Sequence, residues 1–134
     1  MSDLLVEAAR AAMERAYAPY SRFRVGAALE TTDGTVVRGS NVENASYGAV
    51  ICAERSAVAA AVSLGHRAFR RLALASDAPE PVAPCGICRQ VLAEFGLDLE
   101  IVSAGAAGGE VTYNLRELLP RAFTRGDLPG AGAR

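Results

Sequence analysis

Residues 70–102, RRLALASDAPEPVAPCGICRQVLAEFGLDLEIV, contain a strand, a loop, a helix and a second strand in that order. The apolar run at 70–76 predicts the first strand, and three prolines make 77–84 a loop. Apolar side chains at helical spacing predict a helix over 85–95, and 97–102 is the second strand. This order of elements favours a sheet covered by helices.

The upstream residues predict two more helices and a hairpin. Apolar residues recur at helical spacing over 3–16, and an alanine-rich stretch predicts a buried helix over 52–64. Between these helices, apolar residues alternate with polar or small ones over 23–29, which is the pattern of a strand. That strand runs to Asp33-Gly34, a strong hairpin signal, and 35–42 is its return strand.

The remaining residues complete the expected fold. A weak strand is predicted at 110–113 and a short helix at 115–119. A hairpin followed by two strand-helix alternations favours a mixed sheet with helices on both faces. We therefore predict an α/β fold, a three-layer α/β/α sandwich with a mixed five-stranded sheet, formed by one domain over 1–125. Residues 126–134 have no periodicity and are predicted to be a flexible tail.

Composition excludes several classes of protein. With 134 residues and 51% hydrophobic content, the chain has enough apolar material for the core of one globular domain. A net charge of −1 with scattered basic residues is not the pattern of a nucleic-acid-binding protein. All 14 basic residues are arginine, which excludes a Schiff-base lysine and the lysine of a phosphate-binding loop. Small-molecule chemistry is favoured.

The sequence favours a cytoplasmic location. Its first residues carry acid where a secretory signal needs a basic flank, and the longest apolar stretch, 56–65, is too short to cross a membrane. We expect no membrane partner. Three cysteines are an odd number, and without an export signal reduced thiolates that bind a metal are favoured over disulfides.

The three cysteines fall in two short motifs, Cys52-Ala53-Glu54 and Pro84-Cys85-Gly86-Ile87-Cys88. Structural zinc sites normally have four protein ligands, whereas catalytic sites have three and leave one position for water or substrate. We therefore predict that Cys52, Cys85 and Cys88 bind one Zn²⁺ per chain, with Glu54 as a catalytic carboxylate beside it. Cys85 and Cys88 lie one turn apart on the same helix face, and Cys52 must lie at or before the first turn of its own helix.

Two alternatives remain for these cysteines. A Cys-x-x-Cys pair near strand-helix alternation is also typical of thioredoxin-like redox proteins. The other alternative is a structural zinc site closed by His66, the single histidine. His66 follows Cys52 by 14 residues, about 20 Å along a continuous helix, which argues against this site.

A zinc ion with three thiolates has a net charge of −1, so a positive group should stand beside the sulfurs. Arg55 follows Glu54 and Arg89 follows Cys88, and both are predicted to donate to the thiolates from outside the ligand set. Either arginine could instead be an ordinary surface residue.

The chain resembles the cytidine deaminases over almost its whole length. The resemblance rests on the two cysteine motifs, on residues 18–23 (APYSRF), 25–28 (VGAA) and 41–48 (NVENASYG), and on Glu117-Leu118-Leu119-Pro120. In its short length and its three cysteine ligands, the chain is similar to the homotetrameric branch of that family.

The resemblance implies hydrolytic deamination of cytidine and 2′-deoxycytidine in pyrimidine salvage. Water activated by zinc attacks C4 of cytosine, and Glu54 moves a proton to N3 and later to the departing amine. Phe23 would stack on the base, Asn41 and Glu43 would bind the ribose hydroxyl, and the Ala53 backbone would hold the base carbonyl.

The resemblance also implies a homotetramer with active sites shared between subunits. Ala45, Tyr47 and Phe123 are the residues expected to contribute to substrate binding in a neighbouring site. Within the same fold, a deaminase of nucleoside antibiotics is the nearest alternative, and residues 41–46 favour the plain nucleoside. A zinc protein without catalytic activity is the alternative from another class.

Overall fold

The structure is a computed structural model, and it describes residues 3–130. Five strands form one mixed sheet in the order β2-β1-β3-β4-β5. β3 and β4 are parallel and the other neighbouring pairs are antiparallel, so the sheet is mixed, as predicted. The strands are β1 (Val25–Thr31), β2 (Val36–Ser40), β3 (Phe69–Ser76), β4 (Glu100–Ala104) and β5 (Glu110–Asn114).

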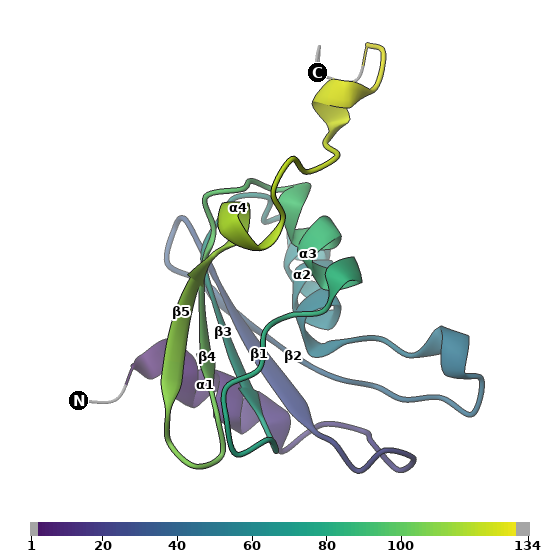
Figure 1. Cartoon of the computed structure of the whole chain (residues 1–134), viewed down its shortest axis with the longest axis vertical. Coiled ribbons are helices and arrows are strands. Elements are labelled where there is room, and N and C mark those ends of the chain that lie inside the picture. Colours follow the sequence, from purple (N-terminus) through teal and green to yellow (C-terminus); the bar gives the residue numbers. More distant parts are fainter. Residues whose placement is uncertain (1–2, 131–134) are drawn as a thin grey trace.

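Helices cover both faces of the sheet, so the predicted three-layer α/β/α arrangement is confirmed (Figure 1). One face carries α1, and the other carries α2, α3 and the short α4. The bounds are α1 (Leu4–Met13), α2 (Ala53–Ser63), α3 (Gly86–Ala93) and α4 (Leu115–Leu118), with two 3-10 helices at Tyr47–Ala49 and Arg125–Asp127.

The central strands are buried on both faces because each face is covered by helices. On β1, Ala27 and Leu29 pack toward α2 while Ala28 packs toward α1. Small side chains let these layers approach closely. A Cβ placed on Gly39 of β2 would lie 2.4 Å from the backbone nitrogen of Ala57, which shows how tightly α2 packs on this strand.

Several predicted boundaries differ from the structure, and β4 spans Glu100–Ala104 instead of the predicted 97–102. The first helix ends at Met13 and not at residue 16, because the N–H of Tyr17 donates to the carbonyl of Asn41 and leads the chain out of the helix. The first strand begins at Val25 and not at Phe23. The residues before it form a turn in which Arg22 has a positive φ of 59°.

The segment after α4 leaves the body of the molecule and runs outward (Figure 1). Its 3-10 helix is capped by a reciprocal pair of hydrogen bonds between Thr124 and Asp127. Residues 131–134 of the predicted tail lie outside the described residues, so its flexibility stays a prediction. None of the helices found between residues 3 and 130 is both long enough and apolar enough to span a membrane.

Candidate functional site

The three cysteine sulfurs lie together at the ends of two helices. The Sγ atoms of Cys52 and Cys85 are 4.0 Å apart, and those of Cys85 and Cys88 are 3.4 Å apart. All three sulfurs lie within 4.8 Å of one another. Tetrahedral zinc with Zn–S bonds of about 2.3 Å places its sulfur ligands about 3.8 Å apart. The three thiols therefore fit a zinc ion, with one coordination position left over.

The helix ends explain why these sulfurs converge. Cys52 is the N-cap residue of α2 and Cys85 is the N-cap residue of α3, both with extended backbone, while Cys88 lies in the first turn of α3. Cys52 therefore lies before the first turn, as its spacing from Glu54 requires. Helix N-termini carry partial positive charge, which stabilises thiolates and the anionic cluster that they form with a metal.

Cys85 and Cys88 differ in how readily they ionise. Burial raises the pKa of Cys85, but hydrogen bonds from the Cys88 and Ile87 backbone and the neighbouring thiols outweigh burial, so the net shift is downward. Burial raises the pKa of Cys88 strongly, and the nearby Glu54 carboxylate raises it further. Cys85 therefore ionises more readily than Cys88, and a bound metal ion would favour the deprotonated form of both sulfurs.

Glu54 lies in the first turn of α2, two residues after Cys52, and only 6% of it is exposed. Burial raises the pKa of its carboxyl above the ordinary value, while the partners Cys88 and Arg55 oppose the shift. A carboxyl with a raised pKa that lies beside the zinc ligands is suited to accept a proton and return it.

Arg55 contacts the cluster, but Arg89 has other partners. One nitrogen of the Arg55 guanidinium, Nη2, lies 3.6 Å from the Cys52 sulfur and 3.1 Å from the Val50 carbonyl. Arg89 donates instead to the carbonyls of Pro84 at 2.8 Å and Leu118 at 2.9 Å. It therefore ties the loop before α3 to α4, and the sulfur contact predicted for it is absent from the hydrogen bonds found in residues 3–130.

His66 does not join the cluster. Its Nδ1 lies 3.9 Å from the Asp33 carboxylate at the turn between β1 and β2. Within the described part of the chain, the three cysteines are the only group of metal-ligating side chains, and all three are free of disulfide bonds. The structure thus argues against a structural zinc site with four protein ligands.

A small ladder of backbone hydrogen bonds brings Asn41 and Glu43 next to the first zinc ligand. The intervening Val42 exchanges two backbone hydrogen bonds with Ile51, the residue before Cys52. On its other side, the Glu43 N–H donates to the carbonyl of Tyr17 at 2.8 Å. The resemblance implies that Asn41 and Glu43 share a site with Cys52, and this ladder brings the three residues close together.

Asn41 fixes the chain around Phe23. Its Nδ2 donates to the Phe23 carbonyl, and its Oδ1 accepts from the Val25 N–H, each over 2.9 Å. Asn41 itself is buried, whereas Phe23 is 38% exposed at the end of the turn. Phe23 is therefore partly accessible from solvent, as a residue that stacks on a ligand must be.

Glu43 has a partner that sequence reasoning missed, Ser21. The Oε1 atom of Glu43 accepts from the backbone N–H groups of Tyr20 at 2.9 Å and Ser21 at 3.1 Å, and its Oε2 accepts from the Ser21 hydroxyl. Chiefly because of the Ser21 hydroxyl, the pKa of the Glu43 carboxyl lies below its ordinary value. The segment 18–23 that carried the family resemblance was the available signal for Ser21.

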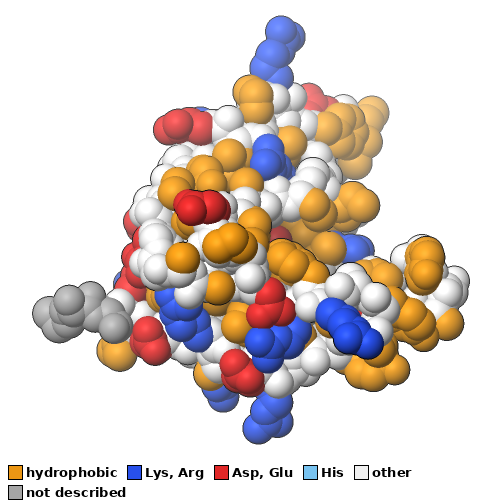
Figure 2. Space-filling model, turned by 60° about the horizontal axis from the view of Figure 1, so that its bottom comes forward, with side chains coloured by type: hydrophobic (Ala, Val, Ile, Leu, Met, Phe, Trp, Pro, Cys, Tyr) orange, Lys and Arg blue, Asp and Glu red, His pale blue; other side chains and the backbone are white. Residues whose placement is uncertain are grey.

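The other predicted substrate-binding residues lie at the edges of this region. Ala53 is the buried first residue of α2, where backbone N–H groups have no partner within the helix. Ala45 and Tyr47 lie on the loop that projects from the body in Figure 1, and Tyr47 is 77% exposed. The space-filling view shows hydrophobic side chains on this projection, with acidic and basic ones interspersed elsewhere on the same face (Figure 2).

Phe123 lies on the outgoing C-terminal segment and is 57% exposed. The side-chain nitrogen of Gln90 on α3 donates to the Phe123 carbonyl at 2.8 Å. Gln90 follows the zinc ligand Cys88 by two residues, so this contact links the C-terminal segment to the helix that carries the metal site. Sequence reasoning missed Gln90 as well, although it lies only two residues after the second cysteine motif.

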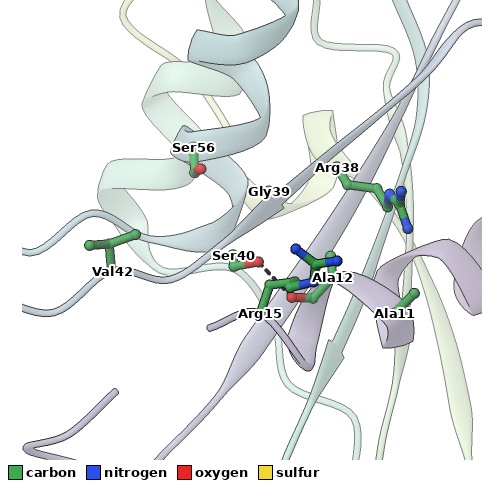
Figure 3. Close-up of a pocket in the computed structure, with 8 residues that line it drawn as sticks. All are labelled: Ala11, Ala12, Arg15, Arg38, Gly39, Ser40, Val42 and Ser56. Atoms are coloured by element: carbon green, nitrogen blue, oxygen red, sulfur yellow. Dashed lines mark hydrogen bonds between the residues drawn. The ribbon is translucent and has the colours of Figure 1, made fainter. Parts of the chain in front are cut away.

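Two hollows lie near these elements. One, of about 270 Å³, is lined by Ser21 and Glu43 together with Tyr20, Asn44, Tyr47 and Val50. Its Tyr20 and Tyr47 rings meet edge to face, with centroids 6.2 Å apart. The other, of about 370 Å³, lies between α1, β2 and α2, where the Ser40 hydroxyl donates to the Ala12 carbonyl (Figure 3). None of the predicted site residues lines that second hollow.

Comparison with known proteins agrees with the fold and the metal site. Residues 2–104 match the family model described as the cytidine and deoxycytidylate deaminase zinc-binding region. A cytidine deaminase of Halalkalibacterium halodurans is 48% identical over 127 residues, which is 94% of this chain and 96% of that protein. The chain belongs to the cytidine and deoxycytidylate deaminase family.

Solved structures and a more distant relative refine this placement. The crystal structure of cytidine deaminase from Burkholderia pseudomallei has 50% sequence identity and a TM-score of 0.88, covering 92% of this chain and all of that one. A blasticidin-S deaminase of Bacillus cereus is 30% identical and covers 78% of this chain and 80% of that protein. This chain is therefore less similar to the blasticidin-S deaminase than to the cytidine deaminases.

Proposed function

We propose that the chain hydrolyses cytidine and 2′-deoxycytidine to uridine and 2′-deoxyuridine and releases ammonia. The observation that carries this proposal is the cluster of three sulfurs at two helix N-termini with the buried Glu54 beside it. Three ligands leave a zinc ion one open position, as hydrolytic zinc enzymes require. The chain is therefore a zinc-dependent cytidine deaminase.

Cys52, Cys85 and Cys88 would hold the zinc ion, which when bound would activate a water for attack on C4 of the cytosine ring. Glu54 would pass one proton of the attacking water to N3, and would then pass the second, from the hydroxyl formed at C4, to the amine, so that ammonia leaves and C4 becomes a carbonyl. Its burial suits this work, because a raised pKa keeps both protonation states accessible. Arg55 donates to the Cys52 sulfur and so reduces the negative charge that three thiolates place on the metal.

The remaining residues bind and orient the nucleoside. Phe23 stacks on the base, and a backbone N–H at Ala53 holds the base carbonyl. Asn41 and Glu43 hydrogen-bond the 3′-hydroxyl, which cytidine and 2′-deoxycytidine share, so both are substrates. A site with groups dedicated to the sugar discriminates against free cytosine, because those groups lose a partner when the sugar is missing.

The active enzyme is a homotetramer in which each site uses residues from a neighbouring subunit. Two projecting segments support this proposal: the loop with Ala45 and Tyr47, and the C-terminal segment with Phe123 (Figure 1). Both carry exposed aromatic side chains, which are costly to leave in water and are enriched at interfaces. Phe123 closes over the base in a partner's site.

We further infer that the enzyme works in pyrimidine salvage in the cytoplasm. Deamination of a free nucleoside is a recovery step for pyrimidines. The three zinc ligands are free thiols, which persist in a reducing compartment.

The proposal is tested by measuring ammonia release from cytidine, 2′-deoxycytidine, cytosine and blasticidin S by protein that carries one zinc per chain. Cytidine and 2′-deoxycytidine should be deaminated with similar kcat/KM. Cytosine should react at least about a hundredfold more slowly, because the groups that bind the sugar are left unpaired. Preferential turnover of blasticidin S would instead assign the chain to the antibiotic-modifying alternative, and a zinc-loaded protein inactive on all four would contradict the proposal.

A further inference from the structure

Ser21 occupies the point where the two groups proposed to hold the nucleoside meet. Its hydroxyl donates to the Oε2 atom of Glu43 and accepts from the backbone N–H of Phe23 at 3.0 Å. One hydroxyl therefore connects the carboxylate proposed for the sugar with the ring proposed for the base. Both Ser21 and Glu43 line the hollow of about 270 Å³.

The turn that contains Ser21 has an unusual backbone conformation. Arg22, the residue between Ser21 and Phe23, has a φ of 59°, a conformation that is uncommon for a residue other than glycine. The turn is closed by a hydrogen bond from the Arg22 N–H to the Ala18 carbonyl over 3.0 Å. A backbone in a sparsely populated region persists only where its surroundings hold it there, and such positions cluster at ligand-binding sites.

Phe23 is held from both sides as a result. Ser21 accepts its N–H, and the Asn41 amide accepts from the N–H of Val25 while it donates to the Phe23 carbonyl at 2.9 Å. Removal of the Ser21 hydroxyl leaves the Asn41 contacts and the two backbone hydrogen bonds to Glu43 in place. The fold should therefore survive, while Phe23 and Glu43 lose their connection.

We infer that Ser21 is a positioning residue for the nucleoside, because its hydroxyl fixes the Glu43 carboxylate and the Phe23 backbone relative to each other. This inference rests on the proposed function, since it assigns Glu43 to the sugar and Phe23 to the base. Both contacts require a side chain that donates one hydrogen bond and accepts another. Serine and threonine can do this, and alanine cannot. The chemistry of deamination does not involve Ser21.

Loss of the Ser21 hydroxyl should change KM without a matching change in kcat. Side chains that are already ordered in the free enzyme lose little conformational entropy when the substrate binds. Loss of the Ser21 connection would increase that entropy cost and so weaken substrate binding. The enzyme binds the sugar and the stacked base equally well in the ground state and in the transition state. The rate constant of the enzyme–substrate complex, kcat, therefore changes little. Ser21→Ala should raise KM for cytidine about three- to tenfold and leave kcat within about twofold.

The test compares Ser21→Ala, Ser21→Thr and Ser63→Ala with the wild type, each with one zinc per chain. Ser63 is an exposed serine at the end of α2 and serves as the control. Ser21→Thr keeps the hydroxyl and should restore KM to within about twofold of the wild type, and Ser63→Ala should leave both constants unchanged. Melting temperatures within about 2 °C of each other would show that the fold is intact.

The outcomes separate the role of Ser21 from the proposed function. Wild-type turnover with an unchanged KM in Ser21→Ala would overturn the role of Ser21 alone. Equal impairment of Ser21→Ala and Ser21→Thr would also overturn it, because the hydroxyl would then be irrelevant. A zinc-loaded wild type without turnover would overturn the proposed function, and the assignment of Ser21 would fall with it.

Discussion

Glu54 differs from the other carboxylates between residues 3 and 130 in being buried. A buried carboxylate normally costs stability unless it is paired, and the groups near Glu54 are the zinc ligands and Arg55. Burial without an ion pair of its own among the described residues is what the proposed catalytic role of Glu54 would explain. Its position, two residues after one zinc ligand, fixes it beside the metal.

Glu54→Gln is expected to keep the fold and one zinc per chain but to lower kcat by about 10²–10⁴-fold, because the amide cannot carry the proton. Metal analysis and ammonia release on the same sample check both parts. Glu94→Gln, at the exposed end of α3, is the matched control and should retain full activity. A fully active Glu54→Gln would show that another group moves the proton.

Arg55→Ala should lower activity or zinc affinity about 10–100-fold, because the Cys52 sulfur loses its donor and the cluster becomes more negative. Zinc affinity by competition with a chelator and kcat on cytidine are the measurements. Arg67→Ala, an exposed arginine beyond α2, is the control. If Arg55→Ala behaves like Arg67→Ala in both assays, the contact with sulfur is not functional.

The positions of Arg55 and Arg89 in the sequence did not predict which of the two contacts a cysteine sulfur. Arg55 and Arg89 each follow a site residue, so the sequence treats them alike. Successive residues of a helix point about 100° apart, and only the neighbours in space decide which partner each one meets. For Arg89 those neighbours are carbonyls of the loop before α3 and of α4.

At the scale of elements, α2 must lie close to β2 for Cys52 to reach the other two sulfurs. Gly39 permits this approach, since an added Cβ would lie 2.4 Å from the nitrogen and 2.9 Å from the Cα of Ala57. The position of the metal site therefore depends on a strand residue that has no chemical role.

Gly39→Ala should destabilise the protein by about 1–3 kcal/mol, because a methyl group in this contact forces α2 away from the sheet. Urea unfolding followed by circular dichroism measures the change. Gly48→Ala is the matched control, because a Cβ there has no heavy atom within 4 Å. Equal unfolding midpoints for the two variants would mean that the contact between α2 and β2 is looser than the structure indicates.

Local patterns predicted the order and type of the elements well, but not the boundaries that long-range contacts set. Periodicity indicated α2, α3 and the strand between them, and the two cysteine motifs indicated where both helices begin. The end of α1 depends on the hydrogen bond from Tyr17 to Asn41, 24 residues away in sequence. Likewise, the link from Ser21 to Glu43 spans 22 residues, and no local pattern marks it.

At the scale of the molecule, two segments extend beyond the body that contains the zinc cluster (Figure 1). Both segments carry an exposed aromatic residue, Tyr47 at 77% and Phe123 at 57% exposure. Sites completed by neighbouring subunits would give these side chains partners. This explanation makes oligomerisation a condition for activity.

Mixed oligomers test whether Phe123 acts in a neighbouring site. Phe123→Ala chains lack the aromatic side chain and Glu54→Gln chains lack the proton carrier, so each homo-oligomer should have low activity on cytidine. Coexpressed chains should form hybrid sites with an intact Glu54 from one subunit and an intact Phe123 from another. Activity well above the sum of the two parents is expected, whereas activity equal to that sum would place Phe123 in its own subunit's site.

The most direct test of the zinc-dependent mechanism is ammonia release from cytidine as a function of the zinc bound per chain. Partial removal of zinc with a chelator gives samples of one preparation that differ only in metal content. The rate should rise in proportion to bound zinc and reach its maximum at one ion per chain, since three thiolates at two helix ends form one site. A rate independent of zinc, or no turnover at full occupancy, would contradict the account.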